Sequence, residues 1–371
     1  MRTYLVSGLA GATALVLAGA SVTASASPGS SRERLRQEVA AVVAAGATGA
    51  SAEVDAGTHR VRAVAGTATR GSARPVPANG RFRAGSVTKT FVGAVVLQLV
   101  AEHRLGLDDT VDDVLPGVLP AGTGITVREL LNHTSGLPDI LTTLPRPTTP
   151  EFLALRWHTW SQRELVARVA DKPLLFTPGS RASYSNTNYL LLGLIVERVT
   201  GTPFRTAIER RIIRPLGLPG TSVPGTDPVI HGPHAHGYLP VERADGSVSV
   251  VDITAINPTV LGFAGEIVST TRDLNRFYAA LFDGTLLPPY LVAQMRTPAV
   301  GSVYGLGVIE QPLSCGITAW GKDGDAPGYS TWVFSAPDNS RRVTVSATWG
   351  RTDHNKLGDA VDDLLDAELC P

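Results

Sequence analysis

The sequence predicts an α/β fold in which an antiparallel β-sheet is flanked by terminal helices and a mainly helical region is inserted into the sheet domain. Strand–turn–strand patterns occur near both ends of the chain, helical patterns flank them, and the middle of the chain carries helix start signals. With 371 residues, of which 43% are hydrophobic, the chain can bury a sizeable core.

The terminal regions each combine one helix with one β-hairpin. A helix near residues 31–45 precedes a hairpin over residues 50–64, and a hairpin over residues 329–349 precedes an amphipathic helix over residues 355–369. The C-terminal hairpin is rich in Val, Thr, Trp and Phe, which favour strands. Both ends are therefore expected to contribute to one sheet.

The middle of the chain favours helices. Thr126-x-x-Glu129 and Ser161-x-x-Glu164 have the capping-box pattern, in which a hydroxyl and a carboxylate satisfy the first amides of a helix. A further helix is expected over residues 189–200.

The segment between residues 217 and 262 is rich in Pro and Gly and has little periodicity, which is more typical of loops that shape a binding cleft than of a core. We therefore expect a sheet domain of residues 27–85 plus 262–371, and a mainly helical domain with cleft loops over residues 86–261.

The first 26 residues have the layout of a secretory signal peptide. Arg2 is followed by an apolar stretch that closes on Ala24-Ser25-Ala26, so cleavage is expected near Ala26 and the mature protein is expected to be secreted. No later window approaches the roughly 18 apolar residues of a spanning helix, so we expect no membrane contact in the mature form.

Export changes the interpretation of the two cysteines, because thiols oxidise outside the cytoplasm. Cys315 and Cys370 are expected to form a disulfide, and two buried thiols are the alternative.

The balance of 33 basic and 33 acidic residues removes the basic excess that binding a phosphate backbone requires, so nucleic acid is not an expected partner.

One serine and one lysine stand three positions apart at the start of an apolar helix. Ser86 and Lys89 would lie one turn apart on one face, within hydrogen-bond reach. Burial would lower the pKa of Lys89, so that its amine could take the proton of the Ser86 hydroxyl. The alternative is an ordinary helix start.

Two further triplets follow in the chain, and with them the sequence resembles the penicillin-recognising serine hydrolases, in the branch of class C β-lactamases and secreted D-alanyl-D-alanine carboxypeptidases. The resemblance covers the chain from about residue 50 onward and implies a β-lactamase/transpeptidase-like fold. It is carried by three boxes and two lesser runs: Ser86-Val87-Thr88-Lys89, Tyr184-Ser185-Asn186, Lys322-Asp323-Gly324, residues 130–137 and residues 264–270.

The resemblance implies a role for each matched residue. Ser86 would be the nucleophile, Lys89 its activating partner, and Tyr184 the relay of a proton to the leaving group, as a phenolate or by sharing a proton with Lys89. Asn186 would hold the substrate amide and order the lysine, and Lys322 would attract an anionic substrate group. A core aromatic is the alternative for Tyr184, and a solvated charge is the alternative for Lys322.

The resemblance also implies an oxyanion hole, and the sequence departs from the family pattern at two positions. Gly324 and Asp325 would lie on the substrate-binding strand, and the amides of Ser86 and Asp325 would hold the oxyanion. The acid at Asp325 opposes a substrate carboxylate and favours an ammonium, which weakens a carboxypeptidase assignment. Glu266 replaces a residue that is usually small, and the sequence offers no account of it.

The histidines do not suggest a metal enzyme. His231, His234 and His236 form a His-x-x-His-x-His run, but no nearby cysteine or acidic pair completes a metal shell, so no metal is expected. His133 is expected to be structural. A Ser-His-Asp hydrolase of the α/β type is disfavoured because no Gly-x-Ser-x-Gly elbow occurs.

These observations predict a secreted serine D-alanyl-D-alanine carboxypeptidase-like enzyme that works without a cofactor. Its expected partners are a peptidoglycan stem peptide or a small substrate containing a D-amino acid, with β-lactams as acylating ligands. Three alternatives stay open: a class C β-lactamase, an esterase or D-aminopeptidase on the same scaffold, and a non-catalytic peptidoglycan-binding module.

Overall fold

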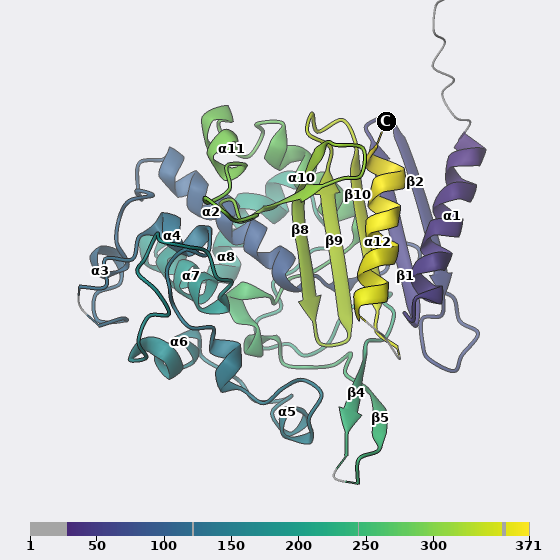
Figure 1. Cartoon of the computed structure of the whole chain (residues 1–371), viewed down its shortest axis with the longest axis horizontal. Helices are drawn as coiled ribbons and strands as arrows, with labels where there is room; N and C mark the ends of the chain where they lie inside the picture. The colour runs from purple at the N-terminus through teal and green to yellow at the C-terminus, as the bar shows by residue number, and fades with distance from the viewer. Residues whose placement is uncertain (1–27, 121, 244, 351–353, 371) are drawn as a thin grey trace, which may run out of the picture.

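The computed structural model describes residues 28–120, 122–243, 245–350 and 354–370. The predicted signal peptide, residues 1–26, lies outside these residues. A six-stranded antiparallel sheet forms one side of the molecule and a group of helices the other (Figure 1). The predicted fold class is confirmed, whereas the exact division into two domains stays a prediction.

The sheet joins strands from both ends of the chain in the order β2-β1-β10-β9-β8-β7. The N-terminal hairpin pairs with the C-terminal strand β10, so Gly49 faces Thr348 and Asp55 faces Arg342. The strands are β1 (Gly49–Ala56), β2 (His59–Gly66), β7 (Ile309–Pro312), β8 (Thr318–Ala326), β9 (Tyr329–Ser335) and β10 (Arg342–Thr348). Both predicted hairpins are thus confirmed.

The terminal helices α1 (Pro28–Ala44) and α12 (His354–Leu369) cover one face of this sheet (Figure 1). Leucines and valines of both helices pack against alternate residues of β1 and β10 in one apolar core. The helix α10 (Thr271–Phe282) lies on the opposite face, where a larger core continues into the helical region.

The helical region is centred on two apolar helices, α2 (Thr88–Ala101) and α7 (Asn186–Thr200), which are buried over most of their length. Thr126 and Glu129 form the predicted reciprocal capping box, and the Ser161 hydroxyl accepts from the Glu164 amide. The other helices are α3 (Val111–Val114), α4 (Val127–Leu131), α5 (Pro150–Ala154), α6 (Gln162–Ala170), α8 (Phe204–Ile208), α9 (Arg214–Leu216) and α11 (Pro289–Met295).

The Pro/Gly-rich segment over residues 217–262 differs from the prediction. It contains a two-stranded hairpin, β4 (Tyr238–Glu242) and β5 (Val248–Asp252), which projects beyond the end of the main sheet (Figure 1). Its strands contain Val241, Val248, Val250 and Val251, and valine favours strands. Among the described residues of the segment, Leu261 lines the pocket beside Ser86. Two short strands, β3 (Phe82–Arg83) and β6 (Val268–Ser269), pair nearby.

Cys315 and Cys370 form the predicted disulfide, with their Cα atoms 6.0 Å apart. It ties the turn between β7 and β8 to the end of α12. Within the described residues, none of the helices combines the length and the apolar character needed to cross a bilayer.

Candidate active site

Ser86 lies on a 3-10 turn, Gly85–Val87, that leads directly into α2. Its hydroxyl oxygen lies 3.0 Å from Lys89 Nζ, as the spacing of three predicts. Gly85 has a φ of 53° and lies against the backbone of Asp325, where an added Cβ would come within 2.4 Å of the Asp325 carbonyl oxygen. A glycine is required here so that the nucleophile turn can approach β8.

Lys89 is fully buried, and its amine has three polar neighbours. In addition to Ser86 Oγ, Nζ lies 2.8 Å from Asn186 Oδ1 and 2.8 Å from the Ala264 carbonyl oxygen. Burial and the nearby Lys322 ammonium hold the pKa of Lys89 well below its usual range. A neutral amine has two N–H groups and one lone pair. The two pure acceptors occupy the N–H groups, which leaves the lone pair for the Ser86 hydroxyl.

Tyr184 completes the immediate surroundings of the nucleophile. Its hydroxyl lies 2.6 Å from Ser86 Oγ, and the Lys89 and Lys322 amines lie 5.0 Å and 5.7 Å from its ring centre. Burial raises the pKa of Tyr184 well above its usual range, and the hydrogen bond to Ser86 only partly opposes this effect. The resting side chain is therefore a neutral phenol, a proton donor rather than a base.

Lys322, Gly324 and Asp325 lie on β8 beside the nucleophile turn. An added Cβ at Gly324 would come within 2.3 Å of the Ala84 carbonyl oxygen and 2.7 Å of the Ser86 amide. Asp325 faces Ser330 one pair before the two-residue turn to β9, and at that place an antiparallel pair is not hydrogen-bonded. The amide of Asp325 thus points away from β9 toward the turn of Ser86, as an oxyanion hole requires.

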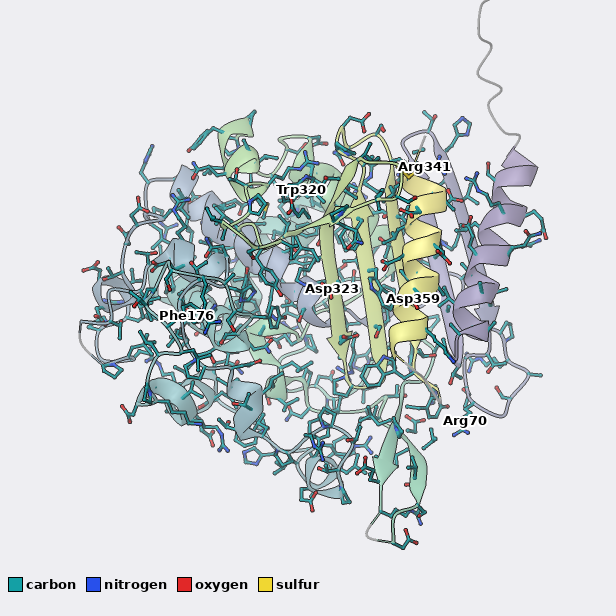
Figure 2. All side chains as sticks on the ribbon, in the orientation of Figure 1. Arg70, Phe176, Trp320, Asp323, Arg341 and Asp359 are labelled. Atoms are coloured by element: carbon teal, nitrogen blue, oxygen red, sulfur yellow. A yellow bond between two sulfur atoms is a disulfide. The ribbon has the colours of Figure 1, made fainter. Side chains whose placement is uncertain are left out.

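A pocket of about 410 Å³ opens at Ser86. Its rim carries two carboxylates, and Asp323 lies on β8 at the border between sheet and helices (Figure 2). Lys322, which is 4% exposed, pairs its ammonium with the Asp323 carboxylate, and the Ser330 hydroxyl donates to Asp325. The remaining wall is largely apolar and is formed by Leu141, Leu261, Ala264, Val303, Tyr304 and Ile309.

The segment over residues 133–140 positions the second box through hydrogen bonds of its own. The Ser183 amide donates to the His133 carbonyl oxygen at 2.8 Å, and the Thr187 hydroxyl donates to the Pro138 carbonyl oxygen at 2.6 Å. Asp139 accepts from both the backbone and the side-chain amide of Asn186. Sequence reasoning noted part of this segment as a signature but missed Asp139, because its partner is distant in the sequence.

His133 is structural, as expected. It is buried, its ring packs 4.5 Å from the Tyr184 ring, and its Nδ1 accepts from the Ser185 amide at 3.2 Å. Burial and the positive charge of nearby lysines hold the pKa of His133 well below its usual value. The neutral ring therefore acts as a support for the Tyr184 loop.

Glu266, which the sequence left without an account, ties two loops together. Its buried carboxyl accepts from the Gly225 amide at 3.1 Å, and burial raises its pKa to about 8. The residue lies two positions after Ala264, whose carbonyl oxygen contacts Lys89.

The three clustered histidines have separate partners. His231 Nε2 lies 2.6 Å from Asp227, His236 Nδ1 lies 2.7 Å from Asp252, and His234 contacts a backbone carbonyl. Within the part of the chain that the structure describes, no group of three or more His, Cys, Asp or Glu side chains is arranged to hold a metal ion.

A Ser-Lys-Tyr cluster with a buried lysine, beside the strand that carries Lys322, is the site of a serine hydrolase, and comparison with known families gives the same class. A family model described as Beta-lactamase matches residues 35–367, so the chain belongs to this family of serine hydrolases. The resemblance predicted from the three boxes is confirmed.

One of the curated relatives is a penicillin-binding protein. Penicillin-binding protein 4* of Bacillus subtilis (strain 168) is 28% identical over 286 residues, which are 73% of this chain and 61% of that relative. The chain thus spans about three fifths of the length of such curated relatives.

Two solved structures match over nearly their whole length. A D-stereospecific amidohydrolase from Streptomyces sp. is 37% identical, with a TM-score of 0.81 over 91% of this chain and 98% of that one. The D-amino acid amidase from Ochrobactrum anthropi SV3, complexed with L-phenylalanine amide, is 27% identical, with a TM-score of 0.79 over 90% of this chain and 97% of that one.

Proposed function

We propose that the protein is a serine amidohydrolase that cleaves amides of D-amino acids whose α-amino group is free, through an acyl-enzyme on Ser86. The observation that carries this proposal is the acidic rim of the pocket. Asp323 and Asp325 both line it, and the one cation on the same strand, Lys322, is already paired with Asp323.

The charges in the pocket favour an ammonium over a carboxylate. With Lys89 neutral, Lys322, Asp323 and Asp325 together carry one net negative charge. A substrate ammonium is attracted to such a rim, whereas a C-terminal carboxylate would have to displace Asp323 from Lys322. The apolar wall suits an apolar side chain on the same residue, because covering Leu141 and Val303 removes apolar surface from water.

The protonation states of Ser86, Lys89 and Tyr184 define the order of proton transfers in acylation. Lys89 accepts the Ser86 proton as Oγ forms a bond to the substrate carbonyl carbon, and the amides of Ser86 and Asp325 hold the resulting oxyanion. Tyr184 donates its proton to the leaving nitrogen as the C–N bond breaks, and the Lys89 ammonium returns a proton to the phenolate. Ammonia or an amine departs.

Hydrolysis of the ester uses the same groups. A water molecule adds to the acyl carbonyl carbon and gives a proton to Lys89, and the Lys89 ammonium returns that proton to Ser86 Oγ as the C–O bond breaks. The D-amino acid leaves, and every group returns to its starting state. The phenolate form of Tyr184 is confined to the moment of transfer, because a buried phenolate next to Asp323 and Asp139 is costly.

A D-alanyl-D-alanine carboxypeptidase acting on peptidoglycan stem peptides is the second candidate. The observation in its favour is Lys322, a buried cation in the pocket wall that could receive a terminal carboxylate after Asp323 turns away. The penicillin-binding relatives support this candidate, and the amidohydrolase and amidase neighbours support the first.

The two candidates make opposite predictions for one substrate set. D-Phenylalanine amide, its N-acetyl derivative, its L-enantiomer and a diacyl-lysyl-D-alanyl-D-alanine peptide are compared by kcat/KM, with Ser86→Ala as the control. We expect the free D-amide to exceed the N-acetyl amide by about 10²-fold, and Asp325→Asn to reduce that preference. Faster release of D-alanine from the acylated peptide would establish the carboxypeptidase instead.

Labelled penicillin tests the nucleophile independently of substrate choice. We expect one adduct on the wild type and none on Ser86→Ala, by intact mass. Rapid loss of the adduct would favour a β-lactamase, and absence of any adduct together with absence of amidase activity would favour a binding module.

We also propose that the protein is exported. The pattern of residues 1–26 and the disulfide between Cys315 and Cys370 support this proposal. N-terminal sequencing of the protein from culture medium should begin after Ala26, and recovery of the protein only inside cells with an intact N-terminus would contradict it.

A further inference from the structure

We propose that Asp139 is a positioning residue, which fixes the orientation of the Asn186 amide toward Lys89 and places a negative charge behind it. The proposal concerns the machinery of the proposed hydrolase, and it rests on that function for its kinetic readout only. Asp139 lies outside the three boxes, at the end of the 133–140 segment.

The Asp139 carboxylate collects four hydrogen bonds. Oδ1 accepts from the backbone amide and Nδ2 of Asn186, both at 3.2 Å, and from the Leu141 amide at 3.1 Å. Oδ2 accepts from Asn186 Nδ2 at 3.0 Å. One side chain thus fixes both the start of α7 and the side chain of its first residue.

This arrangement decides which end of the amide faces the catalytic lysine. A carboxylate can only accept, so the NH₂ group of Asn186 must face Asp139, and the amide oxygen must face Lys89 Nζ at 2.8 Å. With the amide reversed, its NH₂ group would face Lys89 Nζ, where the lone pair of the amine is the acceptor. The lone pair of a neutral Lys89 would then turn from Ser86 to that NH₂ group.

Asp139 also acts on the charge state of Lys89. Its negative charge favours the ammonium form and partly offsets burial and Lys322, which favour the amine. The titratable and charged groups around Lys89 come from β8, α7 and the segments before α7, and they are Lys322, Asp323, Asp139, Tyr184, Tyr189 and His133. Of these, Asp139 is the group that accepts hydrogen bonds from Asn186.

The test is Asp139→Asn, studied in the full-length protein. Loss of the charge should lower the pKa of Lys89, so the acid limb of the acylation rate should move to lower pH by about one unit. The asparagine keeps one acceptor oxygen and replaces the other by an NH₂ donor, so the Asn186 amide is held less firmly. The plateau rate should therefore fall by about 10-fold to 100-fold, with little change in binding of the acylating substrate. Acylation of Ser86 by p-nitrophenyl acetate, followed by stopped flow between pH 4 and 10, gives both quantities.

A second measurement needs no activity. The chain has four lysines, so the ¹³Cε signals of labelled lysine can be assigned by single arginine substitutions and titrated by NMR. We expect the Lys89 signal to titrate at lower pH in Asp139→Asn than in the wild type. If the wild type takes no acyl group at Ser86, the proposed function fails, and this titration still decides the role of Asp139.

Thr187→Val is the matched control. It removes the hydroxyl that bonds the Pro138 carbonyl oxygen and the Ile140 amide in the same segment, and it leaves the Asp139 contacts in place. It should lower the thermal stability without moving the pH profile, and Asp139→Glu should restore the wild-type acid limb. An unmoved acid limb and an unmoved Lys89 titration in Asp139→Asn would overturn the proposal.

Discussion

Substitutions of Lys89 and Tyr184 should have non-additive effects on the rate of acylation. Both contact Ser86 Oγ, at 3.0 Å and 2.6 Å, and the phenol can give up its proton only if the Lys89 ammonium replaces it. Lys89→Met and Tyr184→Phe should each slow acylation by an amide about 10²-fold, which corresponds to about 2.7 kcal/mol. Independent effects would give about 10⁴-fold in the double variant, whereas a shared proton cycle predicts a double variant close to the slower single one.

The choice of substrate sharpens this test. An amide nitrogen needs a proton to leave, whereas p-nitrophenolate leaves without one. Tyr184→Phe should therefore lose much less rate with p-nitrophenyl acetate than with D-phenylalanine amide, and Lys89→Met should lose rate with both. Stopped-flow acylation and thermal unfolding of all variants provide the measurements. The shared proton cycle would be refuted if the rate losses of the two single variants multiplied in the double variant. It would also be refuted if Tyr184→Phe lost the same rate with the ester as with the amide.

Three further predictions concern stability and the approach of the sheet to the nucleophile. Replacing Cys315 and Cys370 by serine should cost about 4 kcal/mol in urea unfolding, because the bridge closes a loop of 55 positions, and an unchanged midpoint would contradict this. Glu38 lies beside buried Glu368, and burial raises the pKa of Glu38 to about 7 from 4.5. The folded state therefore binds this proton more tightly than the unfolded state does, and the free energy of unfolding should fall as pH rises from 4.5 to 7. Glu38→Gln should remove that part of the fall in Tm. Equal slopes of Tm against pH in the variant and the wild type would contradict the role of Glu38. Gly324→Ala should reduce kcat at least 10-fold by moving β8 from the nucleophile turn, and wild-type kcat in that variant would show that the turn can yield.

The sequence predicted those parts of the molecule whose signals are local. The hairpins show as alternating β formers around turn residues, and the Ser86–Lys89 contact follows from helical spacing alone. Tyr184 and Lys322 could be added only through the resemblance, because nothing local marks their approach to Ser86.

The missed contacts have a common physical cause. Ala264 contributes a backbone carbonyl to Lys89, and a carbonyl carries no residue-type signal. Asp139 looks like a residue in an ordinary turn until Asn186, 47 positions later, folds onto it. The hairpin of β4 and β5 could not be predicted from the sequence, because its strands are only five residues long and lie in a segment rich in Pro and Gly.

The strand order also constrains how the chain can fold during synthesis. The hairpin of β1 and β2 is made early, yet β1 gains its second neighbour only when β10 has been made, about 290 residues later. Until then one edge of β1 has open amides and carbonyls, a template for pairing with other chains. Ser86 likewise meets its strand partner only after β8 has been made. A nascent chain is therefore inert as an enzyme and vulnerable to aggregation for most of its synthesis, and catalytic activity reports that the two ends of the polypeptide have met.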